Sequence, residues 1–202
     1  TAVSPGFFDR YQYAFGKKIW ITRIFLTVSS HGPKSSFYAK GIVNMLINCV
    51  AYQDGKRLGD ITIEAISDYV CRPDCFVWVA LKDPAPEELS KMQEEFNLHE
   101  LAVEDARHGH QRPKIEEYGD SLFAVLHMVE LAGKELSIGE MNIFVGSNYV
   151  LSVRNDVQTE FMGVRARCER EPLQLQHGAS FVFYALMDAV VDRYFPVLEL
   201  FD

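Results

Sequence analysis

Hydrophobic and polar residues follow a regular pattern from Met45 to the end of the chain. Two mostly apolar runs, Leu46 to Tyr52 and Cys75 to Leu81, have the length and composition of β-strands. Between them, residues Ile63 to Val70 have the pattern of a short helix. Strand, helix and strand at this spacing predict a parallel pair of strands joined by a crossover.

The next predicted helix begins at a proline-containing break, Asp83 to Pro86, because proline suits the first turn of a helix. Its apolar residues Leu89, Met92 and Phe96 are spaced three and four positions apart. This spacing places them on one face of the helix.

The following segment predicts an antiparallel meander of three strands. Leu122 to Leu131 is almost continuously apolar, as expected for a central strand, and short turns lead to Glu135–Val145 and Tyr149–Val153. The rest is predicted as helix, from about Thr159 to Arg170 and from about Ala179 to the end. The predicted fold class is α/β: an α/β/α sandwich with a mixed parallel and antiparallel sheet, followed by a long C-terminal helix.

Residues 1–44 differ from the rest of the chain. Residues 4–6 and 29–33 have the composition of turns and loops, with one possible strand at Ile19 to Val28. We therefore predict an N-terminal extension of unknown role over residues 1–44 and one domain over residues 45–202. The alternative is that this segment supplies an ordinary first strand of the domain.

Charge and composition narrow the class of protein. The net charge of -8 disfavours a nucleic-acid partner, because phosphates demand a basic surface. No run approaches the roughly 20 apolar residues that a membrane-spanning helix requires, and no secretion signal is present, so we expect this stretch to be soluble. Four cysteines without close pairing are typical of reduced thiols in the cytosol.

One acidic residue stands out in the helix predicted from about Leu98 to Ala106. By helical spacing, Asp105 projects onto its apolar stripe, where a carboxylate is costly unless it is paired, hydrogen-bonded or metal-bound. That stripe consists of Leu98, Leu101 and Ala102. Glu104 points away from this stripe, but near the end of the helix its carboxylate can reach a metal ion bound by Asp105. The alternative is that Asp105 caps the turn that follows.

The C-terminal helix carries a stripe of acids with no lysine or arginine among them. The stripe is about a quarter-turn wide and consists of Asp188, Asp192, Glu199 and Asp202. Like charges at this spacing repel each other, whereas hard divalent cations are bound through such oxygen ligands. The alternative is a solvated edge of the helix.

The remaining candidate chemistry is weak. His99, His108 and His110 lie near Asp105, but a His-x-His pair is more typical of an ordinary loop than of a transition-metal site. Nucleophile elbows, phosphate-binding glycine loops and zinc-protease motifs are absent from the sequence. We therefore predict that the protein is not an enzyme and keep a metal-dependent hydrolase using Asp105 and these histidines as an alternative.

The segments from Leu101 to Asp105 and from His110 to Tyr118, which includes His-Gln-Arg-Pro-Lys, resemble the motif of CorA-type magnesium transporters. The resemblance continues through Leu122 to Val129 and resumes at Tyr184 to Phe195, which is similar to the start of that family's long stalk helix. It covers most of residues 45–202.

The resemblance implies a homopentamer in the cell (inner) membrane, with these domains forming a funnel on the cytoplasmic side. Mg²⁺, and also Co²⁺, would be transported through a pore marked by a Gly-Met-Asn tripeptide. That tripeptide and the pore helix are not in this sequence. We therefore expect a chain cut off before its transmembrane helices, which is a monomer or weak oligomer by itself and binds Mg²⁺ weakly.

Regulatory metal ligands are also implied by the resemblance. Asp105, its neighbour Glu104, and Asp188 match the family's intersubunit ligands for Mg²⁺, whose loss at low intracellular magnesium opens the pore. Asp192 and Glu199 match no ligand. The alternatives are the domain of a related Zn²⁺ transporter and, in another class, a structural adaptor without a cation response.

Overall fold

The computed structural model describes residues 46–132, 135–157, 161 and 163–199. The predicted N-terminal extension, residues 1–44, lies outside this range, and so does the end of the chain at residues 200–202. The described residues therefore fall within the predicted domain that begins at residue 45.

Seven strands form one mixed sheet in the order β2-β1-β3-β7-β6-β5-β4. The pair β3 and β7 is parallel, and every other neighbouring pair is antiparallel. The strands are β1 (Leu46–Gln53), β2 (Lys56–Asp60), β3 (Cys75–Lys82), β4 (Lys114–Tyr118), β5 (Ser121–Ala132), β6 (Glu135–Val145) and β7 (Tyr149–Asn155). The predicted meander of β5, β6 and β7 is confirmed, whereas β2 and β4 were not predicted.

The predicted parallel pairing of the first two strands is wrong: β1 and β3 are antiparallel. The reason is the short strand β2, which reverses the chain directly after β1 through a two-residue turn at Asp54 and Gly55. Both turn residues have positive φ, as tight hairpin turns of this kind require. The helical crossover therefore joins β2 to β3, which flank β1 and run in the same direction.

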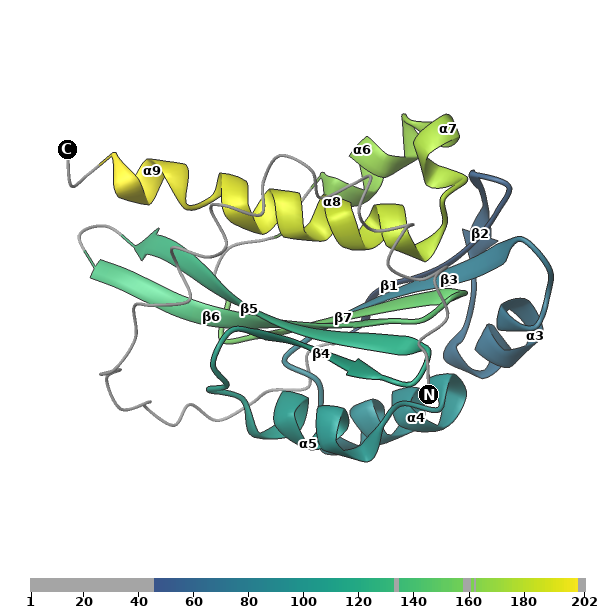
Figure 1. Ribbon diagram of the computed structural model, residues 1–202, viewed down its shortest axis with the longest axis horizontal. Coiled ribbons are helices and arrows are strands. Elements are labelled where there is room, and N and C mark those ends of the chain that lie inside the picture. Colours follow the sequence, from purple (N-terminus) through teal and green to yellow (C-terminus); the bar gives the residue numbers. More distant parts are fainter. Residues whose placement is uncertain (1–45, 133–134, 158–160, 162, 200–202) are drawn as a thin grey trace, which may run out of the picture.

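Helices cover both faces of the sheet, which confirms the α/β/α sandwich (Figure 1). One face carries η1 (Ile63–Ala65), α3 (Ile66–Val70), α4 (Pro86–Phe96) and α5 (Glu100–His108). The other carries α6 (Val164–Glu169), α7 (Pro172–Leu175), α8 (Ala179–Asp192) and α9 (Phe195–Leu198), of which α8 supplies most of the core contacts.

Alternation along the strands builds two separate cores on one sheet. In β1, Val50 and Tyr52 point toward α8, whereas Cys49 and Ala51 point toward α4 and α5. Helix α4 begins at Pro86 and buries the predicted face of Leu89, Met92 and Phe96 in the second core. The prediction, made from spacing alone, that these three residues share one face of the helix is confirmed.

The helices after β7 are shorter than predicted. Helix α6 begins at Val164 rather than near residue 159, because Gly163 precedes it with a φ of 89°; residues 158–160 and 162 lie outside the described residues.

The C-terminal helix is present but interrupted between α8 and α9. Pro196 lies four residues after Asp192, the last residue of α8, and proline cannot donate the backbone hydrogen bond that would continue the helix there. Within the part of the chain that the structure describes, none of the helices is long and apolar enough to cross a lipid bilayer.

Candidate functional site

Helix α5 positions two of the predicted metal ligands, Glu104 and Asp105. Its buried side consists of Ala102, Val103 and Ala106. Leu101, which was predicted on the same apolar stripe as Asp105, is instead 54% exposed. The stripe is therefore rotated from the predicted one, and Asp105 lies at its border, half-buried rather than inside the core.

The Asp105 carboxylate forms an ion pair with Lys114 of β4, whose Nζ lies 2.7 Å from Asp105 Oδ2. The same Nζ lies 2.8 Å from Glu116 Oε2, so one ammonium joins two carboxylates. The alternative in which the Asp105 side chain caps the next turn is not observed: the amide of Gly109 donates to the backbone oxygen of Asp105.

The electrostatics of this triad favour its charged form. Burial by itself would lower the pKa of Lys114, but hydrogen bonds to Asp105 and Glu116 outweigh burial and raise that pKa. The hydrogen bond from Lys114, assisted by one from Tyr118, lowers the pKa of Glu116. The acid on the apolar border is therefore stabilised within the single copy by a lysine nine residues later.

Glu104 lies on the exposed side of α5, one position from Asp105. Its backbone oxygen accepts a hydrogen bond from His108 Nδ1 (2.9 Å), and His99 begins the helix by accepting from the amide of Leu101 (3.3 Å). These two histidines thus have roles at the ends of α5. His110 is exposed, in the loop that follows the helix.

The loop between α5 and β4 is held onto the sheet through Gln111. Its amide donates to Glu140 Oε2 (2.8 Å), and its carbonyl oxygen accepts from His127 Nε2 (2.9 Å). Glu140 and His127 are direct cross-strand partners in β6 and β5. Glu140 is almost fully buried and also accepts from Asn142.

These anchoring residues were not predicted from the sequence. The one available signal was a carboxylate, Glu140, at the start of the mostly apolar second half of a predicted strand. By fixing the His-Gln-Arg-Pro segment to the sheet, they fix where Lys114 begins β4.

Asp188, the third predicted ligand, lies on α8 and is 6% exposed. Its Oδ2 is 2.9 Å from Arg167 Nη1 of α6, and this hydrogen bond raises the pKa of Arg167. The predicted acidic stripe is therefore not uniform, because Asp192 and Glu199 are exposed while Asp188 faces the interior. Asp202 lies outside the described residues. Spacing within α8 could not reveal a partner from another helix.

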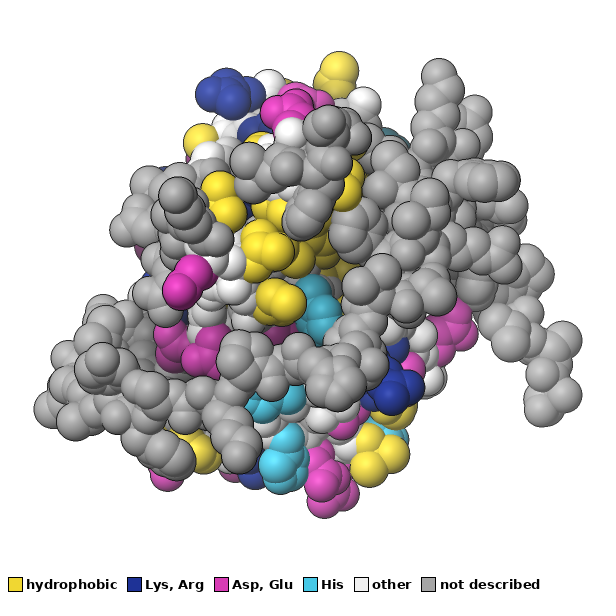
Figure 2. All heavy atoms as spheres, turned by 90° about the vertical axis from the view of Figure 1, so that its left-hand side faces the viewer, with side chains coloured by type: hydrophobic (Ala, Val, Ile, Leu, Met, Phe, Trp, Pro, Cys, Tyr) yellow, Lys and Arg dark blue, Asp and Glu magenta, His cyan; other side chains and the backbone are white. Residues whose placement is uncertain are grey.

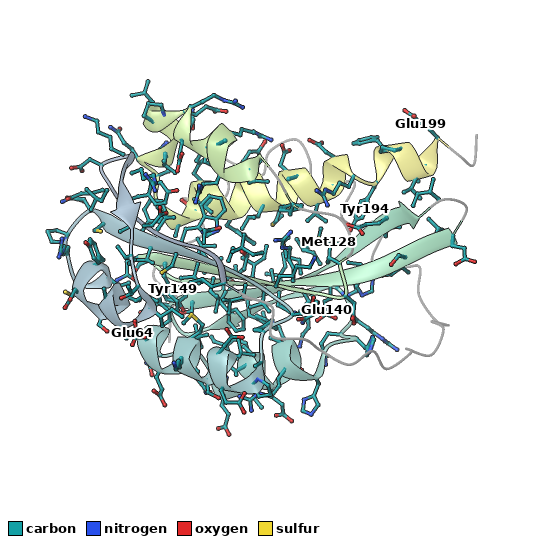
Figure 3. All side chains as sticks on the ribbon, turned by 180° about the vertical axis from the view of Figure 1, so that it is seen from behind. Glu64, Met128, Glu140, Tyr149, Tyr194 and Glu199 are labelled. Carbon is teal, nitrogen blue, oxygen red and sulfur yellow. The ribbon has the colours of Figure 1, made fainter. Side chains whose placement is uncertain are left out.

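The end of α8 is tied to β5 on the same face of the sheet. Arg193 pairs with Glu130 (3.5 Å), and the Tyr194 hydroxyl donates to the carbonyl oxygen of His127. Burial raises the pKa of Tyr194 to about 12. Figure 3 shows Tyr194 between the C-terminal helical segment and the sheet, whereas Glu199 lies farther along and points away. His127 thus connects both sides: its side chain holds the Gln111 loop and its backbone holds Tyr194.

The structure separates Asp105 and Asp188 instead of bringing them together. Helix α5 packs on one face of the sheet and α8 on the other, so the two acids lie on opposite sides of one copy. Among the described residues there is also no group of three or more His, Cys, Asp or Glu side chains that could hold a metal ion. Carboxylate oxygens suit a hard cation, but Glu104, Asp105 and Glu116 do not form such a group within one copy.

The end of the molecule seen from the left of Figure 1 carries a mixture of surface types. Figure 2 shows hydrophobic side chains at its centre, with histidine and acidic side chains beside and below them. Large exposed hydrophobic residues of the β5–β6 hairpin include Leu131, Leu136 and Ile138. This end of the molecule is therefore not uniformly acidic.

Two curated relatives resemble the chain over much of its length. It is 32% identical over 155 residues to the "Putative metal ion transporter YfjQ" of Bacillus subtilis, covering 76% of this chain and 47% of the relative. It is 32% identical over 117 residues to the "Cobalt/magnesium transport protein CorA" of Thermotoga maritima, covering 56% of this chain and 33% of that protein. The chain thus spans less than half the length of these relatives.

Solved structures share the fold at low sequence identity. The full-length CmaX protein matches with a TM-score of 0.60 and 20% identity, covering 80% of this chain and 50% of that chain. The soluble domain of CorA from Methanocaldococcus jannaschii matches with a TM-score of 0.52 and 18% identity, covering 79% and 62%. The ZntB cytoplasmic domain from Vibrio parahaemolyticus matches with a TM-score of 0.51 and 11% identity, covering 79% and 61%.

A protein-family model also matches the chain. The model described as "CorA-like Mg2+ transporter protein" matches residues 74–202, more than half of the chain. Its match includes both α5 and α8, the helices that carry the candidate acids. Together with the Bacillus relative, which is similar over three quarters of the chain, this match shows that the chain belongs to the CorA-like Mg²⁺ transporter family.

Proposed function

We propose that this chain is the cytoplasmic regulatory domain of a divalent-cation transporter of the CorA type, for Mg²⁺ and also Co²⁺. In this proposal, Asp105 and Glu104 of one copy and Asp188 of a neighbouring copy share regulatory Mg²⁺, and the loss of that ion opens the pore. The whole protein is a homopentamer in the cell's inner membrane, with these domains on its cytoplasmic side.

The observation that carries this proposal is the placement of Asp105 and Asp188 on opposite faces of one sheet. Residues on opposite faces of a subunit can share an ion only if one face of a copy meets the other face of the next. Such a head-to-tail contact is heterologous and closes into a ring when its rotation permits. The separation of the acids thus supports a cyclic assembly and disfavours a two-fold dimer as the sensing unit.

The chemistry of the acids supports a weak and reversible sensor. Mg²⁺ is bound by few carboxylates and keeps several of its water molecules, so two or three acids suffice. Acids on facing subunits repel each other until an ion bridges them. Gain or loss of the ion therefore shifts the population between a compact and a splayed assembly.

The three proposed ligands differ in how readily they can reach an ion. Glu104 is exposed, and Asp105 shares a partly exposed contact with Lys114. Asp188 is buried against Arg167, so its participation requires that this pair open or rearrange. We therefore assign first contact with the ion to the α5 acids.

Substitution of Asp105 by Asn tests the proposal. Sedimentation velocity of the chain with and without MgCl₂ should show that Mg²⁺ promotes self-association of the parent, and Asp105→Asn should abolish this response because the substitution removes a charged ligand. Limited proteolysis should show Mg²⁺ protection of the parent alone. Titration with ZnCl₂ in place of MgCl₂ distinguishes the Zn²⁺ alternative.

Glu94→Gln is the matched control, since Glu94 is an exposed acid of α4 on the same face of the sheet. It changes the net charge by the same amount, so it should leave the Mg²⁺ response intact. An equal Mg²⁺ response in the parent and in Asp105→Asn would overturn the proposed role of Asp105.

A further inference from the structure

Two acids from different elements converge on one cation at the edge of the sheet. Asp105 comes from α5 and Glu116 from β4, and both reach Lys114 Nζ, at 2.7 and 2.8 Å. The position between them is therefore one that a positive charge already occupies. Among the proposed ligands on α5, only Asp105 takes part in this arrangement.

The arrangement is built by the alternation of β4. Lys114 and Glu116 pair across the ladder with Val125 and Phe123, whose side chains lie in the core under α4 and α5. Lys114 and Glu116 therefore face the same side of the sheet as α5. The Tyr118 hydroxyl donates to Glu116 Oε2 (3.0 Å), which holds the second carboxylate in place.

Tyr118 is itself fixed from α5. Its ring stacks on that of His99, the N-cap residue directly before α5, with 4.1 Å between ring centroids. The positions of both carboxylates thus depend on the packing of α5 against β4. The three charged side chains remain accessible to water, with exposed fractions of 25% for Asp105, 27% for Lys114 and 39% for Glu116. A hydrated ion can therefore approach them.

We infer that Lys114 is a built-in competitor of the divalent cation, and that Glu116 is a further ligand of that cation beside Asp105. The inference rests on the proposed function. When no ion is bound, the Lys114 ammonium pairs with both acids and offsets one of their two negative charges. A bound Mg²⁺ takes its place between the carboxylates, and the flexible lysine side chain moves into solvent.

Because Asp105, Lys114 and Glu116 are partly exposed, replacing the Lys114 ammonium by Mg²⁺ costs little free energy. Partly exposed ion pairs contribute about 1 kcal/mol or less, so the loss of the Lys114 contacts is easily offset by a doubly charged ion. The contrast is Asp188, which is only 6% exposed and whose separation from Arg167 would be far more costly. Lys114 therefore lowers the affinity for Mg²⁺ without blocking the site, which suits a sensor of abundant ions.

Lys114→Met tests the inference because methionine keeps an apolar side chain of similar length and removes the charge. Titration calorimetry of the chain with MgCl₂ should show binding about five-fold tighter than in the parent, the change that about 1 kcal/mol corresponds to. Adding Glu116→Gln to this variant should reverse the gain. Cobalt chloride should broaden the amide NMR signals of residues in β4 and α5.

Lys56→Met is the matched control, since Lys56 is an exposed lysine of β2, at the opposite edge of the sheet. It should bind Mg²⁺ like the parent. If Lys114→Met binds Mg²⁺ no more tightly than the parent while Asp105→Asn loses binding, Lys114 is not a competitor and the proposed function still stands. If Asp105→Asn binds like the parent, the proposed function fails instead.

The fold of each variant is checked by thermal unfolding followed by circular dichroism. If Lys114→Met does not fold, Lys114→Gln replaces it, with the same expected result. If neither folds, Glu116→Gln alone decides: it retains Lys114 and should weaken Mg²⁺ binding. Unchanged Mg²⁺ affinity in Glu116→Gln overturns the assignment of Glu116.

Discussion

Asp105 and Asp188 are each paired with a basic residue inside a single copy, although neither pairing follows from the helix that carries the acid. Lys114 lies on β4 and Arg167 on α6. The two pairs differ in burial, since Asp188 faces the interior and the Asp105 pair is partly exposed. At the scale of the residue, the Asp188 pair therefore stabilises the fold, and the Asp105 pair is the one that an ion can exchange.

Replacement of Arg167 by Met should lower the free energy of unfolding by about 2 kcal/mol, because it removes the charged partner of a buried carboxylate. Arg165→Met is the matched control: Arg165 lies on the same helix, and its contacts with Glu169 and Asp60 are longer, at 3.7 and 3.9 Å. It should change stability by less than about 0.5 kcal/mol. Urea unfolding measures both, and equal effects would contradict a structural role for the Arg167–Asp188 pair.

At the scale of the element, a tight turn decides how the first three strands are connected. The turn at Asp54 and Gly55 creates β2, and β2 makes the following helical crossover connect β2 to β3 instead of β1 to β3. Gly55 also lies against α7, where a Cβ atom would meet the backbone oxygen of Pro172 and the side chain of Gln176. The first hairpin is thereby linked to the helices on the α8 face.

Gly55→Ala should destabilise the protein by at least about 2 kcal/mol, because it combines a strained positive φ of 73° with an overlap against α7. Gly59→Ala in β2 is the matched control, since it has nothing within 4 Å of its added Cβ atom. It should stay within about 0.5 kcal/mol of the parent. Thermal melts of the two variants provide the comparison, and similar midpoints would refute the proposed contact with α7.

One sheet serves two cores at the scale of the whole molecule. Because alternate residues of each strand point to opposite faces, the α8 side and the α4–α5 side cannot separate without disrupting the same hydrogen-bonded ladders. The ties from both sides meet at His127 of β5, through Gln111 and Tyr194. A change in packing on one face of the sheet is therefore expected to alter the packing on the other face.

Met92→Ala and Phe183→Ala remove buried side chains from opposite cores and should each cost about 2 to 5 kcal/mol. Both variants should still unfold in one transition. Far-UV and near-UV circular dichroism, followed in the same urea titration, should give coincident curves. Separate transitions for the two signals in either variant would show that the two cores unfold independently.

Local periodicity was sufficient to predict most elements of this domain. The buried face of α4, the meander of β5 to β7 and the sandwich architecture follow from patterns within short stretches. The direction of β1 relative to β3 was wrong, because β2 is short and mostly exposed and carries little apolar signal. Elements whose residues are not buried leave no pattern that periodicity can detect.

The sequence by itself determined which acids deserve scrutiny and to which family they point, since the residue types and spacings of α5, the following loop and α8 are local properties. Only the tertiary structure decided that Asp105 meets Lys114 and Glu116, that Asp188 meets Arg167, and that the two acids lie on opposite faces. The physical reason is that charge pairing and the choice of face depend on strand order, which joins residues from separate elements.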